Sequence, residues 1–253
     1  MIAILSPSKT MNEFVVSKET LTKPFFLKEA KLISNYLVRL SKPELAALMK
    51  LSDKLSEQTW ERIQTFHKRR NKESYPALFS YTGEVYAGLH HQPMELSDIQ
   101  YAQTHLRILS GLYGVLKPLD AILPYRLEMA TRLSIGNYNN LYAFWRKRIT
   151  DNINESISNS QSQFLANLAS DEYTKAINLK QITVPVIDFD FLEMKDGIRK
   201  FISFNAKRAR GLMAAFIIRN RIHQPEYLEG FTTEGYTYDR ENSTDSRYVF
   251  IRT

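Results

Sequence analysis

The sequence predicts an α+β protein in which one central mixed β-sheet is flanked by helices. Short apolar runs typical of buried strands recur along the chain, separated by segments whose apolar residues follow helical spacing. The two kinds of segment interleave without a regular strand–helix–strand repeat, which favours α+β over a clean α/β fold. The chain has 253 residues, 43% of them hydrophobic and 24% charged, and shows no linker. We therefore expect a single domain over residues 1–253.

The first third of the chain is expected to begin with a strand and to continue as helices. Met1–Leu5 is an apolar run that ends in Ser-Pro, a pattern typical of a buried first strand. Helices are then predicted over three segments: Phe25–Leu40, a segment that starts at a capping box of Ser41 and Glu44, and a segment from Ser56 that ends in the basic run 67–72.

The rest of the chain alternates between helical and strand patterns. An aromatic segment, Phe79–Leu89, is interrupted by Gly83 and Gly88. Helices are predicted from Ser97, over Leu141–Ile157, and from an Asn205 cap to Arg221. Strands are predicted over Phe164–Leu168, Val184–Phe191 and Lys200–Phe204. The tail pattern predicts a hairpin of Phe231–Tyr238 with Arg247–Ile251.

Basic residues outnumber acidic ones, with 34 Lys and Arg against 27 Asp and Glu. The formal net charge of +7 favours polyanionic partners such as nucleic acid, or small anionic ligands, although a basic solvated surface has the same composition. The start of the chain lacks the features of a signal peptide, and no stretch approaches the roughly 20 apolar residues of a membrane span. We therefore expect a cytoplasmic location and no membrane contact.

Metal and cofactor sites are not expected from the residues available. The chain has no cysteine, and its five histidines lack the spacing of a metal-binding pair. No Walker A, GxGxxG or GxSxG pattern occurs in the sequence. We therefore predict no dedicated metal site and no cofactor.

Two loop segments carry residues suited to binding anions. Ser6–Thr10 follows the first predicted strand and places Lys9 between hydroxyl side chains, where a phosphate or carboxylate could bind. Further along, Gly111 and Gly114 permit a tight turn with positive φ whose backbone amides could meet a phosphate, and Lys117 follows them. An ordinary polar turn explains the first pattern as well, and a purely structural turn explains the second.

Two further segments pair cations with carboxylates. Arg126 and Glu128 alternate with apolar residues, so Glu128 could form an internal pair with Arg126 or hold it toward a ligand. Asp171 and Glu172 follow the predicted strand Phe164–Leu168. The first turns of a later helix carry three cations: Lys207, Arg208 and Arg210. The helix dipole opposes cations at this end, which makes sense if an anion binds there; a solvated basic face is the alternative.

These segments together resemble the YaaA peroxide stress family. The resemblance covers the chain from residue 2 to about residue 251 and rests on five motifs, in this order: ILSPSKT, LRILSGLYGVLKPLDAILPYRLEM, NLASDEY, ISFNAKRARGLMAAFII and FTTEGY. Ser8 departs from the family pattern, in which alanine is as common, but it keeps a small side chain. The resemblance implies a cytoplasmic protein that protects DNA and proteins from peroxide and is associated with limiting unincorporated iron.

The resemblance also implies DNA binding through an unusual α/β fold. A helix-hairpin-helix-like element would then correspond to Leu109–Leu116 and would lie beside a positively charged cleft. The cleft residues implied by the resemblance are Lys9, Arg126, Lys207 and Arg210.

Three functions remain open from the sequence. The first is DNA binding with little dependence on base sequence, through Lys9, Gly111, Gly114, Lys117, Arg126, Lys207, Arg208 and Arg210. The second is an enzyme that acts on a phosphorylated or nucleotide-like small molecule, with three catalytic candidates: Asp171, Glu172 and Lys9. The third is iron handling, against which the poor set of metal ligands counts. We favour DNA as the partner, with a small anionic ligand as the other class; the sequence carries no signal for oligomeric state.

Overall fold

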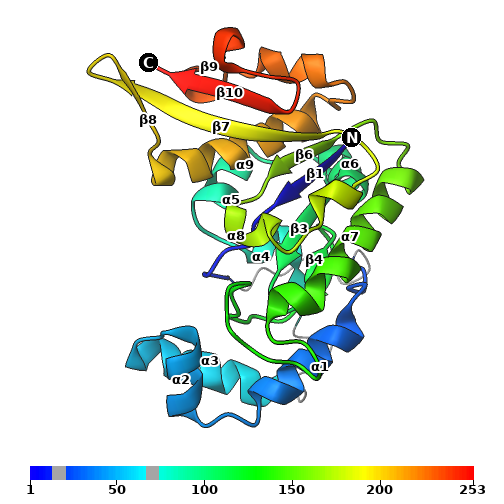
Figure 1. Cartoon of the computed structure of the whole chain (residues 1–253), viewed down its shortest axis with the longest axis vertical. Coiled ribbons are helices and arrows are strands. Elements are labelled where there is room, and N and C mark those ends of the chain that lie inside the picture. Colours follow the sequence, from blue (N-terminus) through cyan, green and yellow to red (C-terminus); the bar gives the residue numbers. More distant parts are fainter. Residues whose placement is uncertain (13–20, 67–73) are drawn as a thin grey trace.

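A mixed eight-stranded sheet forms the centre of the computed structural model, which describes residues 1–12, 21–66 and 74–253 (Figure 1). Seven strands lie in the order β4-β3-β1-β6-β7-β10-β9, and β8 pairs with β7 beside this path. The strand bounds are β1 Ile2–Leu5, β3 Leu106–Ser110, β4 Gly114–Leu116, β6 Leu165–Leu168, β7 Val186–Lys195, β8 Ile198–Lys200, β9 Tyr236–Tyr238 and β10 Arg247–Arg252. The short strands β2 (Tyr75–Pro76) and β5 (Ala121–Ile122) form a separate pair. The predicted α+β class with a central mixed sheet is confirmed, and the basic run at 67–72 lies outside the described residues.

Five neighbouring strands at the centre of the sheet run parallel, in the order β3-β1-β6-β7-β10. β1 is buried over its whole length, as expected for a parallel strand covered on both faces. From β1 the chain first adds β3 on one side and later adds β6 on the other, so the direction of strand addition reverses here. In open parallel sheets, the carboxyl ends of strands at such a reversal form a crevice in which ligands bind.

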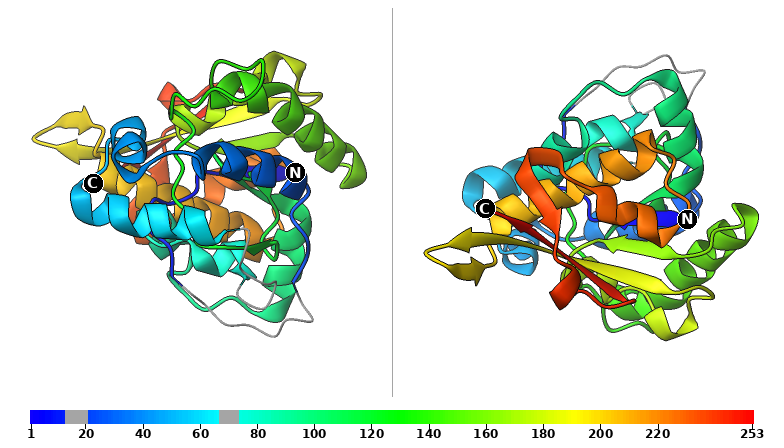
Figure 2. Two further views of the ribbon diagram at one scale, coloured as in Figure 1. Left: turned by 90° about the horizontal axis from the view of Figure 1, so that it is seen from below. Right: turned by 90° about the horizontal axis from the view of Figure 1, so that it is seen from above.

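Helices cover both faces of the sheet. Figure 2 shows α6 and α9 against one face, with α7 and α8 on the other, and α9 contacts β1, β6 and β7. The pair α2 and α3 packs together at the lower end of Figure 1. The helix bounds are α1 Leu27–Leu37, α2 Lys42–Met49, α3 Asp53–Thr65, α4 Ala77–Ser80, α5 Glu84–Leu89, α6 Leu96–His105, α7 Leu141–Asn159, α8 Asp171–Thr174 and α9 Ser203–Arg219. Short 3-10 turns occupy Leu179–Gln181, Pro225–Gly230, Thr233–Gly235 and Arg240–Asn242.

Local sequence patterns correctly predicted several of these elements. The capping box predicted before α2 is present, because the Glu44 carboxylate accepts the backbone N–H of Ser41 at 2.8 Å. The C-terminal hairpin is also confirmed, since β9 pairs antiparallel with β10. The third helix begins at Asp53, three residues before the predicted start at Ser56.

The prediction of a strand over Lys200–Phe204 is wrong. The long helix α9 begins within this segment, at Ser203, which also places its start ahead of the predicted Asn205 cap. Phe201 and Phe204 are 60% and 59% exposed, so their apolar side chains do not mark a buried strand. The pattern of apolar residues predicts secondary structure only where those side chains are buried.

Candidate functional site

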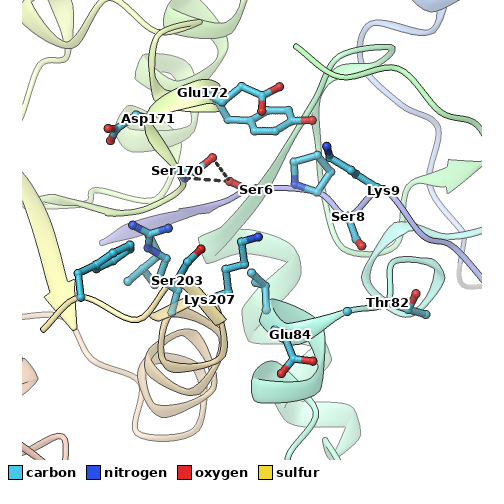
Figure 3. Close-up of a pocket in the computed structure, with 17 residues that line it drawn as sticks. Ser6, Ser8, Lys9, Thr82, Glu84, Ser170, Asp171, Glu172, Ser203 and Lys207 are labelled. Carbon is cyan, nitrogen blue, oxygen red and sulfur yellow. Dashed lines mark hydrogen bonds between the residues drawn. The ribbon is translucent and has the colours of Figure 1, made fainter. Parts of the chain in front are cut away.

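A cavity of about 610 Å³ opens at the carboxyl ends of β1 and β6, where the strand order reverses. Its volume lies within the range of small-molecule sites, roughly 300–1,000 Å³. The loops after β1 and β6 form two of its walls, and the starts of α5 and α9 form the others (Figure 3). Polar and charged residues from these segments line it: Ser6, Ser8, Lys9, Thr82, Glu84, Ser170, Asp171, Glu172, Ser203, Lys207 and Arg210.

Hydrogen bonds join the segments that surround the cavity. Since β1 and β6 are parallel neighbours, their loops start side by side. The Ser170 N–H donates to Ser6 Oγ at 2.9 Å, and the Ser6 hydroxyl donates to Ser170 Oγ at 3.2 Å (Figure 3). The β1 loop is also joined to the segment before α5, because the Thr82 hydroxyl donates to Thr10 Oγ1 at 2.7 Å. These bonds fix three walls of the cavity relative to one another.

The first turns of α9 present one polar face to the cavity. Ser203, Lys207 and Arg210 are four and three residues apart, which puts them on one side of an α-helix, and all three line the cavity. Burial lowers the pKa of the Arg210 guanidinium, an effect that the carboxylates of Asp171 and Asp190 oppose. Within the described residues, neither Lys207 nor Arg210 has a hydrogen-bond or ion-pair partner. Both cations therefore remain available to an added anion.

Three carboxylates share the cavity with these cations. Asp171 and Glu172 begin α8 and lie across the cavity from Lys207, whereas Glu84 begins α5 and lies on the same side as Lys207 (Figure 3). The Glu172 carboxylate accepts the backbone N–H of Ala130 at 3.2 Å, which holds it in place. The cavity is therefore of mixed charge, with cations on α9 facing carboxylates on α8.

Lys9 stands at the edge of the cavity with a half-exposed side chain. Its ammonium forms an ion pair with Glu128 at 2.8 Å, and the same carboxylate accepts a hydrogen bond from the Arg126 guanidinium at 3.2 Å. The internal pair of Arg126 and Glu128, one of the two alternatives considered from the sequence, is thus present. Arg126 does not line the main cavity.

Two glycines allow α5 and α9 to cross in close contact. A Cβ atom at Gly88 would lie 2.1 Å from the carbonyl oxygen of Arg208, and one at Gly211 would lie 1.8 Å from the carbonyl oxygen of Val85. No side chain fits at either distance, so the absence of Cβ is what permits this crossing. The crossing places the start of α5 beside the polar face of α9 and so completes the cavity.

The structure brings together only part of the predicted nucleic-acid surface. Lys9, Lys207 and Arg210 line the cavity, as do the catalytic candidates Asp171 and Glu172. The other predicted residues are not among its lining residues: Gly111, Gly114, Lys117, Arg126 and Arg208. The set that converges therefore contains cations and carboxylates in comparable number.

Gly111 and Gly114 bound a turn that joins two strands rather than two helices. The turn connects β3 to β4, which pair antiparallel, and its residues are buried. The backbone N–H groups of Leu112 and Tyr113 both donate to Ser110 Oγ, at 3.2 and 2.9 Å. These amides are satisfied inside the protein and do not face solvent, where a phosphate would bind.

The two glycines serve close packing in this turn. Gly114 takes a positive φ of +71°, as expected, and the ring of Trp145 would lie 2.5 Å from a Cβ atom there. The prediction of positive φ at Gly111 is wrong, because its backbone is not in that region. A Cβ atom at Gly111 would instead lie 2.4 Å from the carbonyl oxygen of Leu127, so a close backbone approach explains this glycine.

Two of the remaining predicted cations are engaged by carboxylates. The Arg208 guanidinium donates to Glu234 at 2.9 Å from Nε and 2.5 Å from Nη2. This pairing raises the pKa of Arg208 and lowers that of Glu234. Arg126 is paired with Glu128, and its side chain is only 16% exposed. Lys117 is exposed beyond β4, outside the cavity.

Sequence reasoning did not assign four polar residues of the cavity to the site: Thr82, Glu84, Ser170 and Ser203. Ser203 was assigned to a strand, although its spacing to Lys207 and Arg210 would have placed it on their face of a helix. Glu84 follows a glycine and opens the short helix α5, and no sequence motif marks that position. Its role depends on the crossing of α5 and α9, which only the folded chain reveals.

Over residues 1–12, 21–66 and 74–253, no group of three or more His, Cys, Asp or Glu side chains is arranged to hold a metal ion. In the same parts of the chain, no helix combines the length and apolar content that a bilayer span requires.

Similarity to known proteins covers nearly the whole chain. A family model described as peroxide stress protein YaaA matches residues 1–242. The chain belongs to the YaaA peroxide stress protein family. It is 45% identical to a UPF0246 protein of Marinomonas sp. strain MWYL1, over 98% of this chain and 96% of that protein. It is 43% identical to a UPF0246 protein of Burkholderia orbicola and 41% identical to one of Tolumonas auensis, each over 100% of this chain and 98% of the relative.

Membership of the YaaA family confirms the resemblance carried by the five sequence motifs and supports a stress-related role. Three of those motifs supply the loop after β1, the loop after β6 and the start of α9, which all line the cavity. The motif with the paired glycines instead forms the buried turn of β3 and β4. The chemistry of this YaaA protein must therefore be argued from the cavity.

Proposed function

We propose that this YaaA family member serves its stress-related role by binding a small phosphorylated molecule in the cavity bounded by β1, β6 and α9. One observation carries the proposal: Lys207 and Arg210 line a concave site without a partner among the described residues. Withdrawing a charged group from water is unfavourable unless it is hydrogen-bonded or paired. Burial acts on Arg210 in this way, and the carboxylates of Asp171 and Asp190 oppose it without forming an ion pair with the guanidinium in the described part of the chain. A bound phosphate would relieve that cost with charge-assisted hydrogen bonds.

The start of α9 adds to the attraction for an anion. This helix has 17 residues, and the free N–H groups and dipole at its N-terminus favour a negative charge. The same dipole opposes cations in the first turns, so Lys207 is best explained by an anion held between it and the helix start. Ser203 supplies a hydroxyl donor on the same face.

The carboxylates across the cavity suit a small molecule better than a nucleic-acid backbone. Asp171 and Glu172 would repel a run of phosphates, whereas a small ligand can place its single charged end against α9 and its uncharged part against α8. Carboxylates in that position can accept or donate protons. The proposed site is therefore that of an enzyme, with Asp171 and Glu172 acting on the part of the molecule that carries no phosphate.

Isothermal titration calorimetry of the full chain with inorganic pyrophosphate tests this proposal. A hydrogen bond to a charged group contributes about 1.5–3 kcal/mol, so Arg210→Gln should weaken binding roughly 10- to 150-fold. Lys117→Ala is the matched control, because it removes an exposed cation outside the cavity. Absence of binding to the wild-type protein, or equal weakening by the two variants, would contradict the proposal.

DNA binding with little dependence on base sequence is the second candidate, and the net charge of +7 favours it. If Lys9, Lys207 and Arg210 each neutralise one phosphate, log affinity should fall against log salt with a slope of about −3. A variant with all three cations removed should then show a slope near zero in fluorescence anisotropy. An unchanged slope in that variant would exclude the cavity as the DNA site, and displacement of DNA by pyrophosphate would show that both ligands compete for it.

A further inference from the structure

An exposed aromatic side chain adjoins the proposed phosphate site. Three large apolar side chains near the junction of β8 and α9 are 60%, 60% and 59% exposed: Ile198, Phe201 and Phe204. Phe201 lines the cavity, whereas Ile198 and Phe204 are not among its lining residues. Phe201 therefore presents an exposed aromatic ring to the cavity that contains Lys207 and Arg210, whereas Tyr173, another lining aromatic residue, is buried.

Folding alone does not account for the position of Phe201. It precedes Ile202, the N-cap of α9, and an apolar residue at that position commonly packs on the fourth residue of the helix, here Ala206. Ala206 is buried, but most of the Phe201 surface remains exposed, so such a contact covers only a small part of the ring. The uncovered ring offers a planar apolar surface at the edge of a charged cavity.

We propose that Phe201 stacks on a planar ring of the bound molecule, so that the phosphorylated ligand is a nucleotide. This inference rests on the proposed function and assigns the two ends of the ligand. The phosphate lies against Ser203, Lys207 and Arg210, and the base lies on Phe201. The ribose between them faces the carboxylates that line the cavity, which accept hydrogen bonds from its hydroxyls.

The dimensions of the site agree with such a ligand. A helix rises about 1.5 Å per residue, so Lys207, in the middle of the phosphate-binding face, lies about 6 Å along the axis from Ser203, at the end of α9 that Phe201 adjoins. One ribose separates the phosphate from the base in a nucleoside 5′-monophosphate, a spacing of similar size. The cavity of about 610 Å³ is within the range for a ligand of this class.

AMP and ribose 5-phosphate differ only by the base, so their affinities for the full chain isolate the proposed stacking. Calorimetry should show that wild type binds AMP about 5- to 150-fold more tightly, the effect of stacking one base on an aromatic side chain. Phe201→Ala should remove this difference and leave the affinity for ribose 5-phosphate unchanged, whereas Phe201→Tyr should retain it. Phe204→Ala removes an equally exposed ring outside the cavity and should behave as wild type.

Each failure of this experiment has a distinct meaning. Equal wild-type affinity for AMP and ribose 5-phosphate, or a preference for AMP that survives Phe201→Ala, would overturn the nucleotide inference while the phosphate proposal stands. If Phe204→Ala loses the preference for AMP over ribose 5-phosphate just as Phe201→Ala does, the effect is not specific to Phe201 and the proposed stacking is overturned. Absence of binding to AMP, ribose 5-phosphate and pyrophosphate alike would overturn the proposed function itself.

Discussion

Gly211→Ala tests how closely α5 and α9 must cross to build the cavity. A Cβ atom at this position would lie 1.8 Å from the carbonyl oxygen of Val85 and 2.7 Å from the backbone nitrogen of Leu89. Real Cβ contacts essentially never fall below 3.0 Å, so the helices must separate by the difference between 1.8 and 3.0 Å, which is 1.2 Å. Because the obstructing atoms belong to the backbone, no side-chain rotation relieves the contact.

The substitution should lower both stability and ligand affinity. Forcing extra atoms into a packed interior costs about 1–3 kcal/mol, and the backbone clash places Gly211→Ala near the upper end. A chain of this length loses about 2–4 °C of melting temperature per kcal/mol, so we expect a decrease of roughly 6–12 °C. Since α9 carries Lys207 and Arg210, the same displacement should weaken pyrophosphate binding at temperatures where the variant is folded.

Thermal unfolding followed by circular dichroism measures this decrease. Gly230→Ala is the matched control, because its Cβ atom would meet only the Phe216 ring at 4.0 Å, an ordinary contact. It should change the melting temperature by no more than about 2 °C. If Gly211→Ala also stays within that limit, the two helices do not cross as closely as the 1.8 Å distance requires, and the explanation for the shape of the cavity fails.

Two further predictions concern the buried parts of the fold. Burial lowers the pKa of His90, so as the pH falls the unfolded chain binds a proton, near pH 6.5, before the folded protein does. The free energy of unfolding, measured with urea, should therefore decrease from pH 7.5 to 5.5. His90→Gln should make this decrease smaller, whereas His223→Gln, a control at an exposed histidine, should leave it unchanged. If the decrease in His90→Gln is as large as in His223→Gln, protonation of His90 is not its cause. Gly111→Ala should lower the melting temperature although the φ of Gly111 is ordinary, because the Cβ atom would lie 2.4 Å from the carbonyl oxygen of Leu127. An unchanged melting temperature would contradict that close approach.

The elements that could be predicted from sequence are those set by local interactions. The β1 run, the capping box of Ser41 and Glu44, and the C-terminal hairpin each depend on neighbouring residues or on pairing across a short loop. The parallel order β3-β1-β6-β7-β10 joins strands that are far apart in the chain, and no local pattern specifies it. The error at Lys200–Phe204 has a different cause, since two phenylalanines there are exposed rather than buried.

The candidate site was predictable only where its residues directly follow strands or begin a helix. Lys9 and Asp171 follow β1 and β6, so their convergence follows once these strands are neighbours. Arg208 looked equivalent to Lys207 in the sequence, but its partner Glu234 lies 26 residues away and comes close only through the tertiary fold. The turn at Gly111 was predicted to offer backbone amides to a phosphate, but it is buried. The spacing of glycines does not indicate whether a turn faces solvent.

A crystal structure of the protein with AMP would show directly whether the cavity binds a nucleotide. We expect the phosphate in the cavity, within hydrogen-bond distance of the Lys207 ammonium and the Arg210 guanidinium, at the start of α9. We also expect the adenine ring to stack on Phe201. A phosphate bound outside this cavity, for example at Lys117, with Lys207 and Arg210 left uncontacted, would contradict the proposed binding site.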